Sequence, residues 1–178
     1  MRRSTPFLSE RLDLVAFFAA LCLLLSTVEY LIPKPMPFLR LGLANLPILL
    51  ALDAFPLPYI LLLILLKVLG QGLVAGTLFS YVFLFSLAGS LSSGLVMIGS
   101  FRLLGRSISL IGVSVLGALA SNIAQLVLAA LLVFGRGAWL MGPPFLALGT
   151  AAGLLVGLFA RKFAETSHWL RLVREAAR

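Results

Sequence analysis

The sequence predicts an all-α integral membrane protein that forms a single domain, a bundle of six transmembrane helices. Of its 178 residues, 61% are hydrophobic and 11% are charged, which is more apolar than a water-soluble domain of this length. The mean hydropathy of +1.13 points the same way. Most of the chain consists of apolar runs of roughly 17–25 residues, the length with which an α-helix crosses ~30 Å of hydrocarbon. Strands of a membrane barrel would be shorter and alternating, so the spans are predicted to be helices.

The predicted spans follow one another with short connections. A basic head precedes the first span, and the second is short and is followed by Pro56 and Pro58, so we expect it to be tilted or partial. A basic tail follows the last span and carries an apolar face suited to an anionic membrane surface. The predicted spans are 12–31, 41–55, 57–75, 78–99, 108–134 and 142–160, and the tail is 161–178.

A polar segment, 29–45, separates the first two spans. Pro33, Pro35 and Pro37 remove backbone donors and disfavour helix in the residues before them, so this segment cannot continue the first helix. At a membrane surface such irregular backbone suits a loop that caps a pocket. A plain surface connector explains it equally well.

The basic residues predict the orientation of the bundle. The net charge is +8, but its carriers are distributed between the apolar runs rather than gathered in a stripe, so no nucleic-acid partner is expected. With six spans, Lys34, Arg40 and Arg136 lie on one side of the membrane and Lys67 lies within a span. By the positive-inside rule both termini are therefore cytoplasmic. The ten basic residues on the side of the termini are Arg2, Arg3, Arg11, Arg102, Arg106, Arg161, Lys162, Arg171, Arg174 and Arg178.

Lys67 is the first candidate for a site residue, because it stands near the middle of the third span. A charge at that depth costs several kcal/mol unless it is paired or reaches water. Gln71 lies one turn further on the same helical face. Glu29 is the natural counter-ion, with Asp53 as a competitor. Lys67 either faces a ligand cavity or belongs to a structural ion pair, or its head reaches the membrane surface.

The fifth span carries a polar face of Ser114, Gly117, Ser121, Asn122 and Gln125 at helical spacing. Asn and Gln in such a face either hydrogen-bond to a neighbouring helix or contact a ligand. Because Lys67 needs acceptors and the chain offers few, we expect the polar groups to share one pocket in the outer half of the bundle. That pocket would suit an anionic or carbonyl-bearing molecule. The predicted substrate-binding residues are Glu29, Asn45, Lys67, Gln71, Asn122 and Gln125.

Small residues at four-residue spacing predict helix packing. Gly149, Gly153 and Gly157 form a doubled GxxxG ladder in the sixth span, and Gly72 with Gly76 repeats the spacing in the third. Ala16 and Ala20 form a similar pair near the cytoplasmic end of the first span, where the helix of a partner protein could dock.

Missing motifs exclude several kinds of chemistry. There is no phosphate-binding loop motif, so the chain does not itself hydrolyse ATP. Asp13 and Asp53 are the only aspartates, so there is no aspartate-rich pair of motifs for magnesium diphosphate. With one cysteine, Cys22, and one histidine, His168, we expect no metal site and no cofactor. The sequence therefore predicts a protein without catalytic residues.

Several motifs together resemble the Gx transporter family, which is widely labelled heptaprenyl diphosphate synthase component I. The likeness covers about residues 12–160, although members tend to carry arginine at position 67 and histidine at position 121. The motifs are Glu29, LGLAN at 41–45, Lys67 with Gly70 and Gly72, SLAGSLSS at 86–93, GVSVLGA at 112–118, SNIAQ at 121–125 and the GxxxG of the last span.

The resemblance implies a function in the inner or plasma membrane of a prokaryote. The family is similar to the S-components of energy-coupling factor transporters, six-helix proteins whose outward pocket is capped by the loop after the first helix. It implies a subunit that captures a vitamin, flavin or isoprenoid precursor, with a coupling membrane subunit and separate ATPases as partners. Ala16 and Ala20 resemble the helix surface that docks on the coupling subunit. The alternatives are a non-catalytic component I of heptaprenyl diphosphate synthase, or a membrane subunit of a flavin or quinone electron-transfer system.

Overall fold

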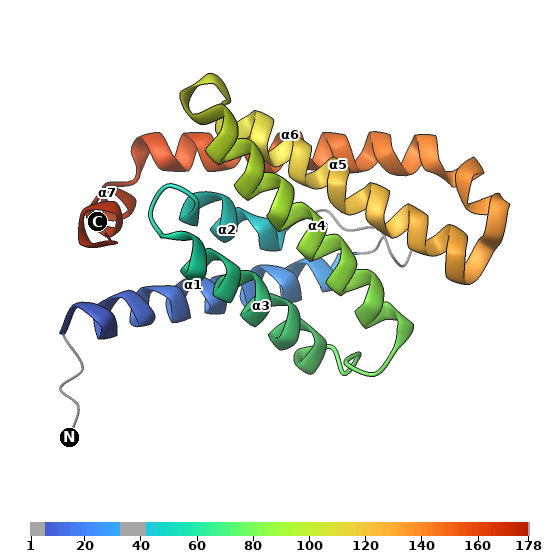
Figure 1. Ribbon diagram of the computed structural model, residues 1–178, viewed down its shortest axis with the longest axis horizontal. Coiled ribbons are helices and arrows are strands. Elements are labelled where there is room, and N and C mark those ends of the chain that lie inside the picture. The colour runs from blue at the N-terminus through green and yellow to red at the C-terminus, as the bar shows by residue number, and fades with distance from the viewer. Residues whose placement is uncertain (1–5, 33–41, 178) are drawn as a thin grey trace.

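The computed structural model describes residues 6–32 and 42–177, and within these ranges it is helical and contains no strand (Figure 1). Five long helices form the bundle, and shorter helical turns connect them. The long helices are α1 (Pro6–Leu31), α3 (Leu57–Val74), α4 (Tyr81–Leu104), α5 (Leu110–Ala129) and α6 (Gly142–Thr166). The shorter elements are η1 (Leu43–Asn45), α2 (Leu46–Ala51), η2 (Gly105–Ser107), η3 (Ala130–Phe134), η4 (Gly135–Met141) and α7 (His168–Ala177).

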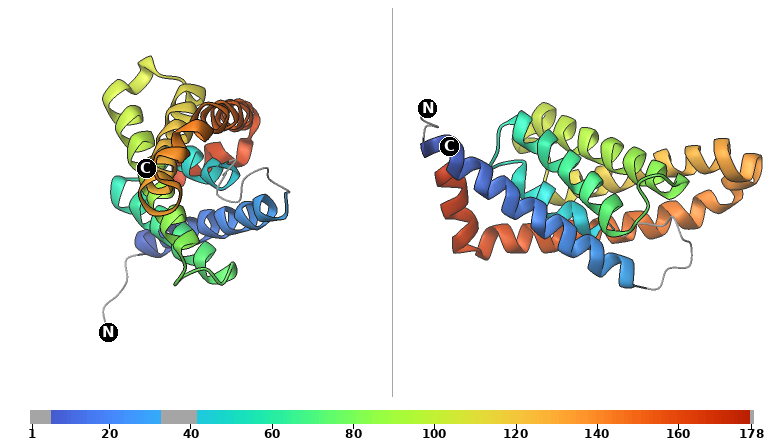
Figure 2. Two further views of the ribbon diagram at one scale, coloured as in Figure 1. Left: turned by 90° about the vertical axis from the view of Figure 1, so that its right-hand side faces the viewer. Right: turned by 90° about the horizontal axis from the view of Figure 1, so that it is seen from below.

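Four stretches of the described chain are long and apolar enough to cross a membrane, namely 11–31, 57–74, 81–104 and 110–166. The last contains both α5 and α6, which lie side by side and are joined at one end by η3 and η4 (Figures 1 and 2). The all-α membrane class is thus confirmed. Large apolar side chains on the outer faces, such as Leu73 and Leu155, are exposed, as expected of helices that face lipid.

The predicted second span, 41–55, is not a membrane-crossing helix, and the count of six spans is not confirmed. In its described part it forms η1 and the six-residue α2. At ~1.5 Å per residue α2 is about 9 Å long, well short of the ~30 Å hydrocarbon core. Its residues 47–51 are all buried, and Pro56 has an extended backbone from which α3 starts. This segment therefore lies inside the bundle and is surrounded by longer helices.

Small residues bring α5 and α6 together, as the glycine ladder predicts. A Cβ on Gly157 would lie 2.8 Å from Ile111 Cα, and one on Gly153 would lie 2.7 Å from Ala118 Cβ. The hydroxyl of Ser114 donates a hydrogen bond of 2.7 Å to the carbonyl of Gly153. The backbones thus approach closely enough for a hydrogen bond that links the two helices.

The other predicted glycine pair packs closely at Gly72 but not at Gly76, so it does not form a second continuous packing seam. Gly72 is buried, and a Cβ there would meet Leu78 and Phe83 at 2.8 Å. Gly76 follows the end of α3 with φ of +63°, and an added Cβ would meet nothing within 4 Å. Gly76 therefore serves the turn that ends the helix, where a left-handed backbone favours glycine.

The predicted basic tail is part of the helical bundle. The sixth helix continues to Thr166, and α7 then turns across the end of the bundle (Figure 2). Leu170 and Val173 of α7 are buried in one apolar cluster with Val15 and Phe18 of α1. The Trp169 ring stacks on Phe18 at a centroid distance of 6.0 Å. The apolar face of the tail thus packs on α1.

Both ends of the described chain lie at the same end of the bundle. The start of α1, the α4–α5 turn and α7 are together there, and the turn after α3 lies at the opposite end with η4 (Figures 1 and 2). This arrangement places Arg11, Arg102 and Arg161 at one end and Arg136 at the other.

Candidate functional site

A small buried cavity lies where α1, η1, α3, α4 and α5 meet, and its volume is about 20 Å³. Five of the six residues predicted to bind substrate line it, so the structure brings together polar groups that are far apart in the sequence. The lining residues are Glu29, Gly42, Ala44, Asn45, Lys67, Gln71, Ser90, Ala118, Ser121 and Asn122.

Lys67 is held inside the bundle by a hydrogen-bonded chain of side chains. Only 3% of the residue is exposed, and its Nζ donates a hydrogen bond to Oδ1 of Asn45 on η1. The amide nitrogen of Asn45 in turn donates to Ser93 Oγ on α4 at 3.2 Å. These two bonds connect α3 to α4 through η1. Lys67 does not extend to the membrane surface, because its ammonium ends in the cavity.

Glu29 fixes the segment that carries Asn45. The carboxylate Oε2 accepts a hydrogen bond of 3.0 Å from the backbone N–H of Leu43, the first residue of η1. Gly42 precedes it with φ of +79°, a backbone conformation that favours glycine. Glu29 is 6% exposed and lines the same cavity as Lys67. Asp53, the competing counter-ion, lies exposed in the turn after α2 and is not part of the cavity lining.

Asn122 is the cavity residue with an unsatisfied donor. It is 2% exposed, and its Nδ2 has no hydrogen-bond partner among the residues that the structure describes. The amide occupies a recess in α6, because a Cβ on Gly149 would lie only 1.4 Å from Nδ2. Buried polar groups in native proteins are nearly always hydrogen-bonded, so this unpartnered amide beside a cavity is a candidate contact for a bound group.

Gln125 does not line the cavity, contrary to the prediction. It is fully buried, and its Nε2 donates a hydrogen bond of 3.1 Å to Ser121 Oγ, which does line the cavity. A Cβ on Gly89 of α4 would meet the Gln125 amide nitrogen at 2.4 Å, so glycine makes room for this side chain too. Gln125 therefore stands behind Ser121 and orients its hydroxyl.

Sequence reasoning missed the contribution of α4. Ser90 lines the cavity and Ser93 bonds to Asn45, and both are buried. The signal was present, since Ser86, Ser90 and Ser93 recur at helical spacing on one face of an apolar span. Three small hydroxyl residues on the inner face of a helix predict contact with polar groups as well as close packing.

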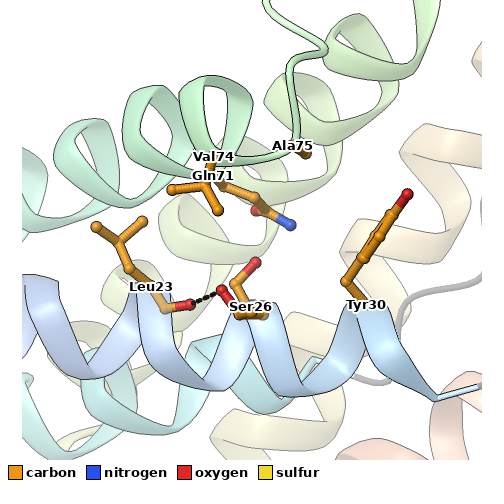
Figure 3. Close-up of a pocket in the computed structure, with 7 residues that line it drawn as sticks. Leu23, Ser26, Tyr30, Gln71, Val74 and Ala75 are labelled. Carbon is orange, nitrogen blue, oxygen red and sulfur yellow. Dashed lines mark hydrogen bonds between the residues drawn. The ribbon is translucent and has the colours of Figure 1, made fainter.

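A second, larger cleft lies between the C-terminal halves of α1 and α3 (Figure 3). Its volume is about 260 Å³. Figure 3 shows the amide of Gln71 within it and the ring of Tyr30 standing along one side. The hydroxyl of Thr27 donates a hydrogen bond of 3.0 Å to the carbonyl of Leu23. The lining residues are Leu23, Ser26, Thr27, Tyr30, Gln71, Val74 and Ala75, so Gln71 belongs to both the cleft and the buried cavity.

The remaining predicted residues lie elsewhere. Ala16 and Ala20 are exposed on the outer face of α1 and line neither of these hollows. The proposed cap, with Pro33, Pro35 and Pro37, lies outside the described residues. Among the described residues no group of three His, Cys, Asp or Glu side chains is arranged to hold a metal ion.

Comparison with known proteins shows that the chain matches the model of one protein family. The family model described as heptaprenyl diphosphate synthase component I matches residues 18–163, which include the residues that line the buried cavity. No curated protein and no solved structure matches the chain.

Proposed function

The chain belongs to the heptaprenyl diphosphate synthase component I family, and from this premise we propose that it is a substrate-binding membrane subunit that captures a small molecule. In this proposal the molecule is bound at the Lys67 cavity and passed to a transport partner of the energy-coupling-factor type. Glu29, Asn45, Lys67, Gln71 and Asn122 form the binding surface, with Gln125 behind it.

The observation that carries the proposal is a buried cation beside an unsatisfied amide donor. Lys67 and Asn122 line the same cavity, and Nδ2 of Asn122 has no hydrogen-bond partner among the described residues. A buried donor without a partner costs about 1–3 kcal/mol. A hydrogen-bond acceptor on a molecule bound beside Asn122 would remove that cost. Hydrogen bonds from the Lys67 ammonium to a charged or carbonyl oxygen are also stronger than hydrogen bonds between neutral groups. The site therefore suits a carboxylate, phosphate or carbonyl group better than a cationic group.

The sequence and the outer face of α1 support a role as one subunit among several. The chain has no phosphate-binding loop motif, so energy for transport would come from separate ATPases. Ala16 and Ala20 are exposed on α1, where a helix of a coupling subunit could approach closely. Replacing both with tryptophan should abolish co-purification of that subunit while leaving thermal unfolding unchanged. A partner retained by the double variant would exclude this face as the docking surface.

The test of the ligand site is native mass spectrometry of the detergent-purified protein, looking for a co-purified small molecule. Lys67→Met removes the charge and keeps the length of the side chain, and it should lose that molecule. The matched control is Leu65→Met, which introduces the same side chain at a half-exposed, lipid-facing position of the same helix. If Lys67→Met retains its molecule at the wild-type level but unfolds at a lower temperature, Lys67 is a structural residue.

The description of the family favours a second candidate, a non-catalytic component of heptaprenyl diphosphate synthase. Such a subunit would purify without a bound molecule and would raise the prenyl-transfer rate when mixed with the catalytic chain. Mixing the two chains and measuring product formation separates the two functions. A co-purified quinone would instead support the electron-transfer alternative.

A further inference from the structure

The volume of the Lys67 cavity sets a problem for any ligand. At about 20 Å³ the cavity has room for roughly one water molecule, or for one small polar group. Sites for small organic molecules usually have volumes of ~300–1,000 Å³. The cavity can therefore hold one end of such a molecule, and the rest must occupy a neighbouring space.

The cleft between α1 and α3 offers that space. The cleft has a volume of about 260 Å³. The combined volume of the cleft and the cavity is close to the lower end of the usual range for such sites. Gln71 lines both, so the cleft and the cavity are adjacent at this residue. Along α3, Lys67 lines the cavity, Gln71 lines both hollows and Val74 lines the cleft, at spacings that keep all three on one helical face.

The walls of the cleft are suited to an amphipathic molecule. Leu23, Val74 and Ala75 supply apolar contacts, and the Tyr30 ring, which is 76% exposed, stands beside them (Figure 3). The polar wall consists of Ser26, Thr27 and Gln71. Because the Thr27 hydroxyl already donates to the Leu23 carbonyl, its oxygen is presented mainly as an acceptor.

We propose that the cleft and the Lys67 cavity are two parts of one binding site, which takes a small amphipathic acid or carbonyl compound. The apolar or ring portion lies in the cleft between α1 and α3, and the acceptor-bearing end passes Gln71 to reach Lys67 and Asn122. The cleft is also the entrance to the cavity. This inference rests on the proposed function, since it assigns a second half and a ligand class to the same site.

The experiment measures access to the cavity with methyl methanethiosulfonate, a small neutral reagent that forms a mixed disulfide with a cysteine thiolate and releases methanesulfinate. The background is Cys22→Ala, which removes the single native thiol. Ser90→Cys reports on the cavity. Ser86→Cys is its control, because Ser86 is equally buried on the same helix, one turn away, and lines neither hollow. We expect Ser90→Cys to be labelled at least tenfold faster, as followed by intact-protein mass.

A second pair of variants tests the entrance. Val74→Trp places an indole in the cleft, whereas Leu73→Trp places the same group at the adjacent position, which does not line it. Both native residues are 66% exposed, so the two substitutions are matched. Val74→Trp should slow the labelling of Ser90→Cys at least tenfold, and Leu73→Trp should leave its rate unchanged.

Two results would overturn the inference. One is equal labelling of Ser90→Cys in the two tryptophan variants, and the other is labelling of Ser90→Cys no faster than that of Ser86→Cys. If Lys67→Met nevertheless loses its co-purified molecule, the site at Lys67 stands and only its extension into the cleft fails. If Lys67→Met also retains the molecule, the proposed function fails with it.

Discussion

Replacing Gly149 with alanine is the sharpest test of the structure around Asn122. The new Cβ would lie 1.4 Å from Nδ2 and 2.7 Å from Cγ of Asn122, whereas ordinary van der Waals contact begins at 3.4 Å. The amide nitrogen must therefore move by about 2 Å, the difference between 3.4 and 1.4 Å. Because Asn122 is 2% exposed and borders the cavity, the nearest space for the displaced amide is the cavity itself.

The expected cost follows from overpacking. Adding a methyl group to a well-packed interior destabilises by ~1–3 kcal/mol, and alanine in place of glycine returns up to ~1 kcal/mol of helix propensity. The matched control is Gly99→Ala on α4, where an added Cβ meets nothing within 4 Å. That variant gains the propensity without the clash. The difference between the two variants should therefore be ~1–3 kcal/mol, all of it from the contact with Asn122.

Thermal unfolding in detergent measures the stability, and native mass spectrometry measures the retained small molecule. Gly149→Ala should lower the unfolding temperature relative to Gly99→Ala and should lose the molecule, since the amide now fills the cavity. Combining it with Asn122→Ala removes the clash, so the double variant should recover stability without recovering binding. If Gly149→Ala is as stable as Gly99→Ala and keeps its molecule, the amide of Asn122 does not occupy the recess at Gly149.

Two further predictions concern the ends of the bundle. Leu170→Ala, at a fully buried position of α7, should destabilise the protein by about 2–5 kcal/mol in thermal unfolding. The control, Leu172→Ala, lies at a position that is 51% exposed and should leave the stability almost unchanged. Equal effects of the two substitutions would mean that α7 does not pack on α1. The orientation of the bundle in the membrane can be tested with Leu103→Cys and Leu140→Cys in the Cys22→Ala background. The two native residues are similarly exposed, at 87% and 85%, and lie at opposite ends of the bundle. A membrane-impermeant thiol reagent should label position 140 in intact cells and position 103 only after permeabilisation, and the reverse pattern would invert the topology.

Sequence reasoning located much of the cavity because the energetic argument at Lys67 is local. A lysine deep in an apolar run needs acceptors wherever the neighbouring helices lie, and few polar residues were available. The same argument gave Asn45 as one of several possible acceptors, and which of them bonds to Lys67 depends on how η1 is held. The contact between Glu29 and the Leu43 backbone is set by the tertiary structure, and side-chain patterns carry no sign of it.

Pro56 and Pro58 predict that the second helix is short, but its burial inside the bundle and the roles of single glycines were beyond sequence reasoning for a related reason. Residues 41–55 are apolar enough for a span, but they are apolar because α2 is buried on all sides. Gly149 fits a packing ladder by spacing, yet its neighbour is the amide of Asn122. Gln125 shares a polar face with Asn122 but lies ~4.5 Å further along α5, which removes it from the cavity. Periodicity predicts which residues share one face of a helix, but it does not predict which residues of other helices that face contacts.

The packing of α7 against α1 also bears on how the protein is made. Leu170 and Val173 complete the apolar cluster around Val15 and Phe18 of α1, which precedes α7 in the chain by more than a hundred residues. Until residues 168–177 are synthesised, α7 cannot cover that surface of α1. This end of the bundle is thus completed only after α7 has been synthesised, late relative to the insertion of α1.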